Sequence, residues 1–259
     1  MTQLTEYYRA IRRESSLIAY WRMGGSDLAG TRAIDFAGKY GLNGIYNGLP
    51  VSRSAQISAV GNEIGSFSPG SKEYGSEGQN LEIPDSVPLR VTGDITIEGW
   101  IIILKERFTG WIIGKPGEAE YIAAPYCIML SEGKKILFAM GNGVSQAELY
   151  SAVTMPLSIP TYFAATSYRG KMKLYINGVL SESKAIGAQE IKDNKQPLYI
   201  GENGGNLGGS RFNFSGLCGE FALYNGALSA TSIKEHFSIG RQIIYRKPYY
   251  TTYDLPSYS

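Results

Sequence analysis

Hydrophobic and polar residues alternate in short runs along most of the chain, and turn-forming residues separate these runs. Alternation places successive side chains on opposite faces of a strand, so each run predicts a strand of a half-buried sheet. The predicted strands occupy residues 17–23, 80–84, 94–104, 110–115, 125–131, 135–141, 147–153, 161–168, 171–176, 179–184, 197–201 and 216–225. Regular strand spacing with turn residues between the strands is typical of an antiparallel sandwich.

The two ends of the chain follow other patterns. Apolar residues recur at helical spacing in residues 4–14, which predicts a short amphipathic helix whose stripe is Leu4, Tyr7, Tyr8 and Ile11. Ser229 is a suitable N-cap for a second helix over residues 230–237. Residues 24–79 are rich in Gly and Ser and predict loops and short strands, and residues 240–259 show neither period.

The segment KLYINGVL, residues 173–180, predicts the tightest turn of the chain. Asn177-Gly178 suits a two-residue type I′ turn, which needs positive φ at both positions. In this register Lys173 lies opposite Glu182, a favourable cross-strand pair. The dry face of the hairpin is expected to carry Met172, Leu174, Ile176 and Val179.

Composition narrows the class of protein. The chain has 259 residues, 43% of them hydrophobic, which suits one large all-β domain or two small domains. A net charge of +2 argues against a nucleic-acid-binding surface, and no apolar run is long enough to span a membrane. The N-terminal residues have no apolar stretch of the kind found in secretory signals. Cys127 and Cys218 are expected to be reduced, buried fillers, with a single bridge as the alternative.

Six segments, taken in order, resemble the laminin-G-like branch of the concanavalin A-like lectin/glucanase superfamily. They are LIAYWRMGG (17–25), GLNGIYNG (41–48), LEIPDSVPLRVTGDITIEGWI (81–101), YFAATSYRGKMKLYINGVL (162–180), PLYIGEN (197–203) and FSGLCGEFALYNGALSATSIKEHF (214–237). The resemblance implies an all-β, two-sheet antiparallel jelly-roll sandwich over residues 15–238, with a short N-terminal helix and one C-terminal helix. Residues 1–14 then form a helical arm and residues 239–259 an extended tail.

The sequence contains few of the residue arrangements that catalysis requires. Glucanases of the resembled superfamily use paired carboxylates on one strand, and the nearest match is Asp94 and Glu98. Along one strand these residues lie about 13 Å apart, whereas retaining glycosidases need about 5–5.5 Å. Glu118 and Glu120 are expected in a solvated loop, and His236, the single histidine, in the last turn of the final helix. The sequence therefore predicts a non-catalytic protein.

Calcium is the cofactor that the resemblance brings into question, since many laminin-G-like domains bind it. Asp35 matches an early Asp of the family and Glu220 a late Glu, but Gly219 stands where an Asp is common. Calcium prefers six to eight oxygen ligands with several carboxylates. We therefore predict no cofactor and no tight metal site, with Asp35 and Glu220 as weak candidates.

The terminal segments carry the expected binding residues. Aromatic and Arg residues, which are enriched at interface hot spots, interleave in the tail, although a solvated end is the alternative. The candidate attachment residues are Tyr7, Tyr8, Ile11, Arg241, Tyr245, Arg246, Tyr249, Tyr250 and Tyr253. The stripe of the helix 4–14 is expected to face either a partner or its own domain. The stretch YYRAIRRESSLIAYWRMG (7–24), a Tyr-containing helix followed by the opening strand, also looks like the start of similar domains in bacteriophage structural proteins.

These features predict a binding or assembly module of a phage virion, on the capsid or the tail. Its expected partners are other virion proteins or identical subunits, with glycans as further candidates and no nucleic acid or membrane insertion. A secreted, extracellular lectin or a glucanase-type enzyme is the alternative.

Overall fold

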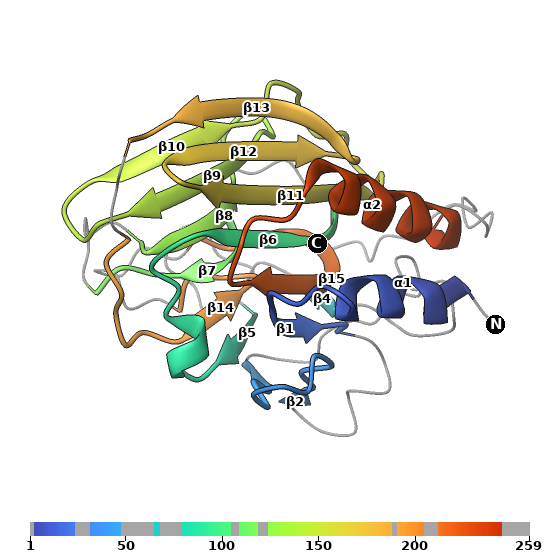
Figure 1. Cartoon of the computed structure of the whole chain (residues 1–259), viewed down its shortest axis with the longest axis horizontal. Helices are drawn as coiled ribbons and strands as arrows, with labels where there is room; N and C mark the ends of the chain where they lie inside the picture. The colour runs from blue at the N-terminus through green and yellow to red at the C-terminus, as the bar shows by residue number, and fades with distance from the viewer. Residues whose placement is uncertain are drawn as a thin grey trace, which may run out of the picture.

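The computed structural model describes residues 3–23, 32–47, 65–67, 79–104, 109–118, 124–187, 191–204 and 212–244. Two antiparallel sheets pack face to face, as Figure 1 shows, and two helices lie side by side against one of them. The predicted two-sheet sandwich with one helix near each end is confirmed. Within the described residues, no helix is long and apolar enough to cross a membrane.

Sheet A, the helix-covered sheet, has the strand order β1-β15-β6-β11-β12-β13, and β4 also pairs with β15. Its strands are β1 (Leu17–Trp21), β4 (Gly65–Phe67), β6 (Ile95–Ile103), β11 (Thr161–Tyr168), β12 (Lys171–Ile176), β13 (Val179–Ala185) and β15 (Gly216–Tyr224). The first and last strands of the chain are thus neighbours in this sheet.

Sheet B has the order β10-β9-β8-β7-β14-β5-β3-β2. Its strands are β2 (Arg32–Ala33), β3 (Gly44–Asn47), β5 (Asn80–Ile83), β7 (Gly110–Lys115), β8 (Tyr126–Leu130), β9 (Ile136–Gly141), β10 (Gln146–Tyr150) and β14 (Leu198–Ile200). A short 3-10 helix, η2 (Val87–Leu89), follows β5. Most strands lie within two residues of their predicted bounds.

The main core lies between the sheets and is built by strand alternation. Every second residue of β6 faces it, and these residues are Ile95, Ile97, Gly99, Ile101 and Ile103. Phe163 of β11 and Phe221 of β15 pack beside them with ring centroids 6.0 Å apart. Cys218 lies in this core and Cys127 on the outer side of sheet B; both are free and buried, as predicted for small fillers.

A second core lies between the outer face of sheet A and the helices α1 (Gln3–Arg12) and α2 (Ala230–Ile244). Tyr7 and Ile11 of α1 and Ile233 of α2 are buried there against Trp100 and Tyr162 of the sheet. The predicted N-cap is confirmed, because the Ser229 hydroxyl accepts the Ser232 N–H at 3.0 Å. The part of the outer face of sheet A that the helices cover is therefore an interior surface.

The second helix is longer than the sequence predicted, ending at Ile244 rather than at residue 237. Gly240 lies inside it, where an added Cβ would come within 2.8 Å of the Trp100 ring. Glycine is unfavourable in a helix but allows close approach of a neighbouring group. The boundary predicted at residue 238 therefore falls within α2, and Arg241 lies in a helix rather than in a tail.

The predicted hairpin is confirmed at its turn and at the two cross-strand pairs next to it, and its register is wrong beyond them. Asn177 and Gly178 have φ of +50° and +76°, as a type I′ turn requires. A bulge then shifts the register, so that Leu174 faces Glu182 and Lys173 faces Ser183. The Ser181 hydroxyl instead accepts the Ala152 N–H at 3.0 Å. The predicted Lys173–Glu182 pair therefore does not form.

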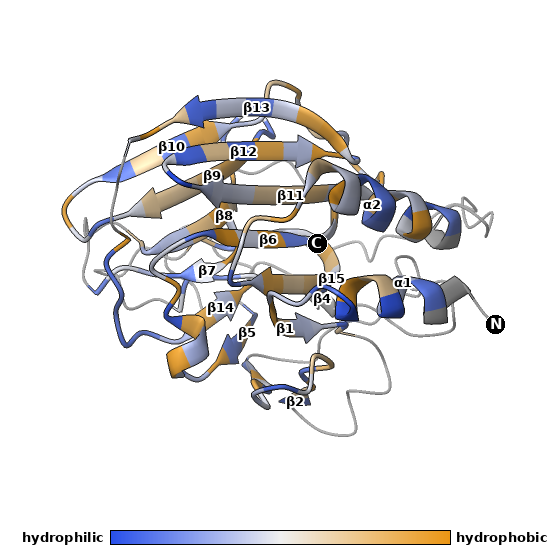
Figure 2. Ribbon diagram, viewed as in Figure 1, coloured by the Kyte–Doolittle hydropathy of each residue, from blue (hydrophilic) through white to orange (hydrophobic). Residues whose placement is uncertain are grey.

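The dry face of that hairpin is also shorter than predicted. Met172, Leu174 and Ile176 lie in the core, but Val179 is 69% exposed. Val179 belongs to β13, the edge strand of sheet A. Figure 2 shows that β13 is hydrophobic at this end and hydrophilic at the other.

Candidate functional site

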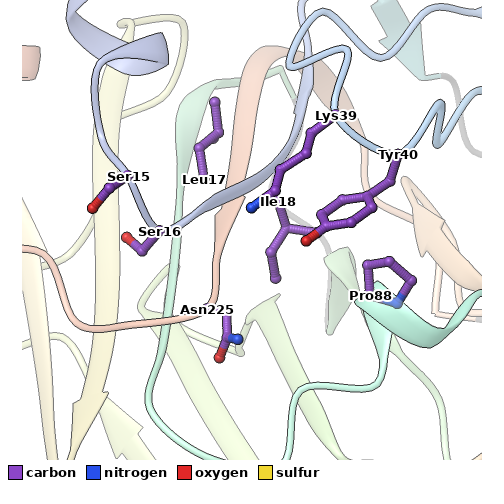
Figure 3. A pocket seen from close by; sticks show the side chains of 8 residues that line it. All are labelled: Ser15, Ser16, Leu17, Ile18, Lys39, Tyr40, Pro88 and Asn225. Carbon is purple, nitrogen blue, oxygen red and sulfur yellow. The ribbon is translucent and has the colours of Figure 1, made fainter.

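A small surface hollow lies beside the first residues of β1, with a volume of about 170 Å³ (Figure 3). Four separate segments meet there: the α1–β1 connection, the turn before β3, the η2 helix and the turn after β15. The residues that line the hollow are Ser15, Ser16, Leu17, Ile18, Lys39, Tyr40, Pro88 and Asn225. Its volume suits one sugar ring or a ligand of similar size, because sites for drug-sized ligands take about 300–1,000 Å³.

The segments around the hollow are held by buried backbone contacts. The Asp35 carboxylate accepts N–H bonds from Tyr20 at 3.0 Å, Ala37 at 2.9 Å and Leu42 at 3.1 Å, so it ties the turn carrying Lys39 and Tyr40 to β1. On the opposite side the Asn225 N–H donates to the Ser16 carbonyl at 2.8 Å. These contacts therefore fix the positions of the lining residues: Leu17 and Ile18 are buried at the base, while Ser15, Lys39, Tyr40 and Asn225 are exposed.

The lining combines an exposed ring with several polar groups. The Tyr40 side chain is 46% exposed, and the Lys39 ammonium lies 5.0 Å from the centre of its ring. Figure 3 shows both side chains reaching across Ile18, with the Lys39 nitrogen and the Tyr40 hydroxyl directed into the hollow. Two serine hydroxyls and the Asn225 amide add hydrogen-bonding groups. An aromatic face beside hydroxyl and amide groups suits a polyhydroxylated ligand.

A second group of chemistry-bearing residues lies in the core under the helices. Glu98 of β6 and His236 of α2 are fully buried, and His236 Nδ1 is 3.1 Å from Glu98 Oε1. The hydroxyls of Tyr162 and Tyr224 also donate to the Glu98 carboxylate. His236 Nε2 lies 3.7 Å from the Glu14 carboxylate. This group therefore connects three strands of sheet A, β6, β11 and β15, with the second helix.

Burial and charge have opposite effects on the pKa values of Glu98 and His236. Burial alone raises the pKa of Glu98, but the charge of His236 and the hydrogen bonds from His236 and the two tyrosines outweigh it, and the net pKa lies below 4.5. Burial lowers the pKa of His236, but Glu98, and more weakly Glu14 and Glu235, raise it to a net value above 6.5. Both shifts favour the charged forms, so the two residues can form a buried ion pair.

The carboxylates considered for catalysis lie in different surroundings. Glu98 is enclosed by the helix layer, so a substrate cannot reach it, and Asp94 accepts the Arg169 N–H at 3.0 Å. Glu118 is exposed and Glu120 lies outside the described residues. The prediction for His236 is wrong in its position: it lies in the middle of α2, buried against Glu98, because the helix continues to Ile244.

The two weak metal candidates are occupied by protein donors. The Asp35 carboxylate accepts the three N–H groups named above. Glu220, at a bulge of β15 with φ of +56°, accepts Arg22 Nη2 at 3.1 Å and the hydroxyl of Tyr20. Among the described residues, no group of three or more His, Cys, Asp or Glu is placed to hold a metal ion.

The predicted attachment residues have different surroundings. Tyr7 and Ile11 are buried against the chain's own sheet A, and Tyr8 is half-buried beside Arg12, so the buried residues of this helix are not available to a partner. Leu4 lies in α1 outside the residues whose side chains are described. Arg241 is exposed on α2, whereas Tyr245, Arg246, Tyr249, Tyr250 and Tyr253 lie outside the described residues.

Sequence reasoning missed Lys39 and Tyr40. Both lie in a segment that the sequence marks only as a loop, between Gly38 and Gly41, which have φ of +69° and +64°. A bulky aromatic residue between two turn glycines was the available signal, because such a side chain is hard to bury. The remaining lining residues have no individual signature, since the fold alone brings them together.

Comparison with known proteins bears on this architecture. The family model for concanavalin A-like lectin/glucanases, in its laminin G form, matches residues 75–234, more than half of the chain. The chain belongs to this superfamily. No match is found among curated proteins.

Solved structures with the superfamily fold resemble the chain at low sequence identity. The binding domain of Paraclostridial Mosquitocidal Protein 1 has a TM-score of 0.63 at 14% identity and covers 88% of this chain. The binding domain of botulinum neurotoxin DC in complex with SialylT has a TM-score of 0.62 at 11% identity and covers 89% of this chain. The chain spans only 52% of each of these two domains.

A third similar structure matches over nearly its whole length. It is Domain 4 of AbnA, an extracellular arabinanase of glycoside hydrolase family 43 from Geobacillus stearothermophilus, solved with arabinotriose. The match has a TM-score of 0.57 at 19% identity and covers 85% of this chain and 98% of that domain. At these identities the similarities establish the fold.

Proposed function

We propose that the chain is a non-catalytic carbohydrate-binding module and that the hollow beside Tyr40 is its binding site. The observation that carries this proposal is the half-exposed Tyr40 ring at the edge of a hollow lined by serine, asparagine and lysine side chains. A sugar can lay its apolar C–H face on the ring while its hydroxyls bond to the polar side chains. Exposed aromatic residues gain their binding energy by this combination of apolar contact and nearby polar groups.

Two further observations support a binding module over an enzyme. The carboxylate of β6 that corresponds best to a catalytic group, Glu98, is sealed under α2 and committed to His236. The similar domain that matches this chain along almost its whole length was solved with arabinotriose, an oligosaccharide. The toxin domains support the proposal less, because the chain spans only about half of each.

A glycan array with a matched tyrosine control tests the proposal. Wild type is compared with Tyr40→Ala and with Tyr168→Ala. Tyr168 is 49% exposed and has the Arg169 guanidinium 5.1 Å from its ring centre, so it resembles Tyr40 in exposure and charge but lies away from the hollow. We expect Tyr40→Ala to weaken glycan binding about tenfold or more, and Tyr168→Ala to leave it unchanged. Absence of binding to any glycan, or equal loss in both variants, would contradict the proposal.

We propose attachment through the residues after α2 as a second function, in the setting of a phage virion that the sequence predicts. The support is compositional: residues 245–259 contain several tyrosines and few aliphatic residues, with Arg246, Lys247, Pro248 and Pro256 among them. Since α2 belongs to the second core, the deletion that tests this begins at Tyr245. The truncated protein is expected to keep its melting temperature and to lose attachment to virion particles or to identical subunits. Normal attachment would exclude the tail as the contact.

A further inference from the structure

We propose that the hollow selects acidic sugars and that Lys39 binds the carboxylate of the ligand. This inference rests on the proposed function, because it names the class of glycan that the same site would take. The lining residues include one cation, Lys39, and no acidic residue. A ligand that enters this hollow therefore meets a positive charge without a fixed counter-ion.

The acidic residues nearest to the hollow in the sequence are all committed elsewhere. Glu14 precedes Ser15, but its carboxylate lies 3.7 Å from His236 Nε2 in the second core. Asp35 precedes Lys39 by four residues and accepts three backbone N–H bonds. Because these side chains turn inward, neither carboxylate is available to neutralise Lys39.

The same arrangement holds on the other two walls. Asp85, just before the η2 helix, accepts Lys115 Nζ at 2.7 Å and also pairs with Arg90. Glu220, five residues before Asn225, pairs with Arg22. Each of these carboxylates therefore has its own cation, and the charge of Lys39 is the one left facing the hollow. Among the described residues, no carboxylate forms an ion pair with Lys39.

The geometry of Lys39 suits recognition of an anion next to a sugar ring. Its ammonium lies over the Tyr40 ring at 5.0 Å from the centre, which holds the long side chain across the hollow. An ammonium has three N–H donors, and contact with one ring face does not use them all. A carboxylate on the sugar can accept from Lys39 while hydroxyls of the same sugar reach Asn225 or the serines.

The test compares acidic glycans with the same glycans after their carboxylates are converted to neutral methyl esters. The array described above contains both forms of each acidic glycan, together with unrelated neutral glycans. Wild type is compared with Lys39→Gln and with Lys171→Gln, an exposed lysine on β12 away from the hollow. Binding is measured at low and at high salt, since the ion pair proposed here is screened by salt.

We expect the acidic form of each bound glycan to bind more tightly than its ester, and high salt to reduce this difference. Lys39→Gln should weaken binding of the acidic form about fivefold, leave the ester unchanged, and match the wild type in melting temperature. Lys171→Gln should change neither. Equal binding of acid and ester, or an equal effect of both lysine variants, would overturn the inference while Tyr40-dependent binding still upheld the proposed function. Binding of no glycan at all would overturn both.

Discussion

The two faces of sheet A are covered in different ways. On the inner face, β6 presents Ile95, Ile97, Ile101 and Ile103 to an apolar core. On the outer face, the alternate residues of that strand include Glu98 and Trp100, which pack under α1 and α2. Strand alternation thus gives one strand two interiors, one without polar side-chain atoms from this strand and one organised around a buried carboxylate.

The difference bears on how each interface is specified. An apolar interface tolerates small shifts, because its attraction does not depend on direction. The outer interface contains Glu98, Tyr162, Tyr224 and His236, whose polar atoms are satisfied when α2 holds one position on the sheet. We infer that the polar group fixes the position of the helix, and that this interface is more sensitive to a single substitution than the apolar one.

The largest expected effect is on Glu98. Glu98→Ala removes one partner from a buried ion pair and strands His236 and two hydroxyls, so the free energy of unfolding should fall by about 3–5 kcal/mol. Ile97→Val, on the inner face of the same strand, should cost about 0.5–1.5 kcal/mol. Chemical denaturation of both variants measures the difference.

A double variant separates the network from simple packing. Glu98→Ala combined with His236→Ala should cost clearly less than the sum of the single variants, because each single change leaves an unpaired buried group. Additive costs would mean that the two residues do not act together, and the outer face would then be no more specific than the inner one.

The second prediction compares a turn beneath α2 with a turn open to solvent. At Gly178, φ is +76° and an added Cβ would come within 2.9 Å of Phe237 on α2. At Gly133, in the β8–β9 turn of sheet B, φ is +75° with nothing within 4 Å. Gly133→Val should therefore cost about 1–3 kcal/mol from backbone strain alone, and Gly178→Val more, as measured by thermal unfolding. Equal losses would show that α2 yields freely at this point.

The third prediction concerns pH and follows from the direction of the His236 shift. Since the folded-state pKa lies above 6.5, the ion pair contributes its full stability below pH 6.5 and loses it as pH rises through the raised value. The lowered pKa of Glu98 means that its contribution is present above pH 4.5 and lost as pH falls through the folded-state value.

A variant isolates this effect from the other titrating groups. The melting temperature of wild type should exceed that of His236→Gln by its largest margin between pH 4.5 and 6.5, and the margin should shrink toward pH 9. A margin that stays constant with pH would indicate that His236 is neutral in the folded protein.

The contrast between the two faces also marks what the sequence could predict. The inner core was predictable, because isoleucines at alternate positions of residues 94–104 directly indicate the apolar face of a strand. The outer core was not, because Glu98 between apolar residues reads as a solvent-facing position until a helix 138 residues later in the chain covers it. Gly240, a residue that argues against a helix, is what lets α2 approach Trp100.

The candidate site could not be predicted from the sequence, for a similar reason. Asp35 and Glu220 were predicted because they match family motifs. In the structure both carboxylates bond to other groups of the chain and so stabilise the fold. The hollow instead draws residues from four segments with no shared pattern. In the same way the bulge near Ser181 moved the register of a hairpin whose turn was predicted correctly, since a turn fixes the register only up to the first irregularity.

The smallest expected effect is that of calcium, and it extends the comparison to three buried carboxylates that were considered for chemistry. Glu98, Glu220 and Asp35 each accept bonds from groups of the chain itself, so coordinating a metal would require breaking those bonds. A ligand present at 100 times its dissociation constant adds about 2.7 kcal/mol, which corresponds to about 5–10 °C for a domain of this size. We expect calcium, or a chelator, to move the melting temperature by less than about 1 °C.

Glu220→Gln should lower the melting temperature equally with and without calcium, because the role of Glu220 is to pair with Arg22. A rise of several degrees with calcium in wild type, absent in Glu220→Gln, would instead mean that the buried carboxylates exchange their protein partners for a metal, and that the layer under the helices is not closed.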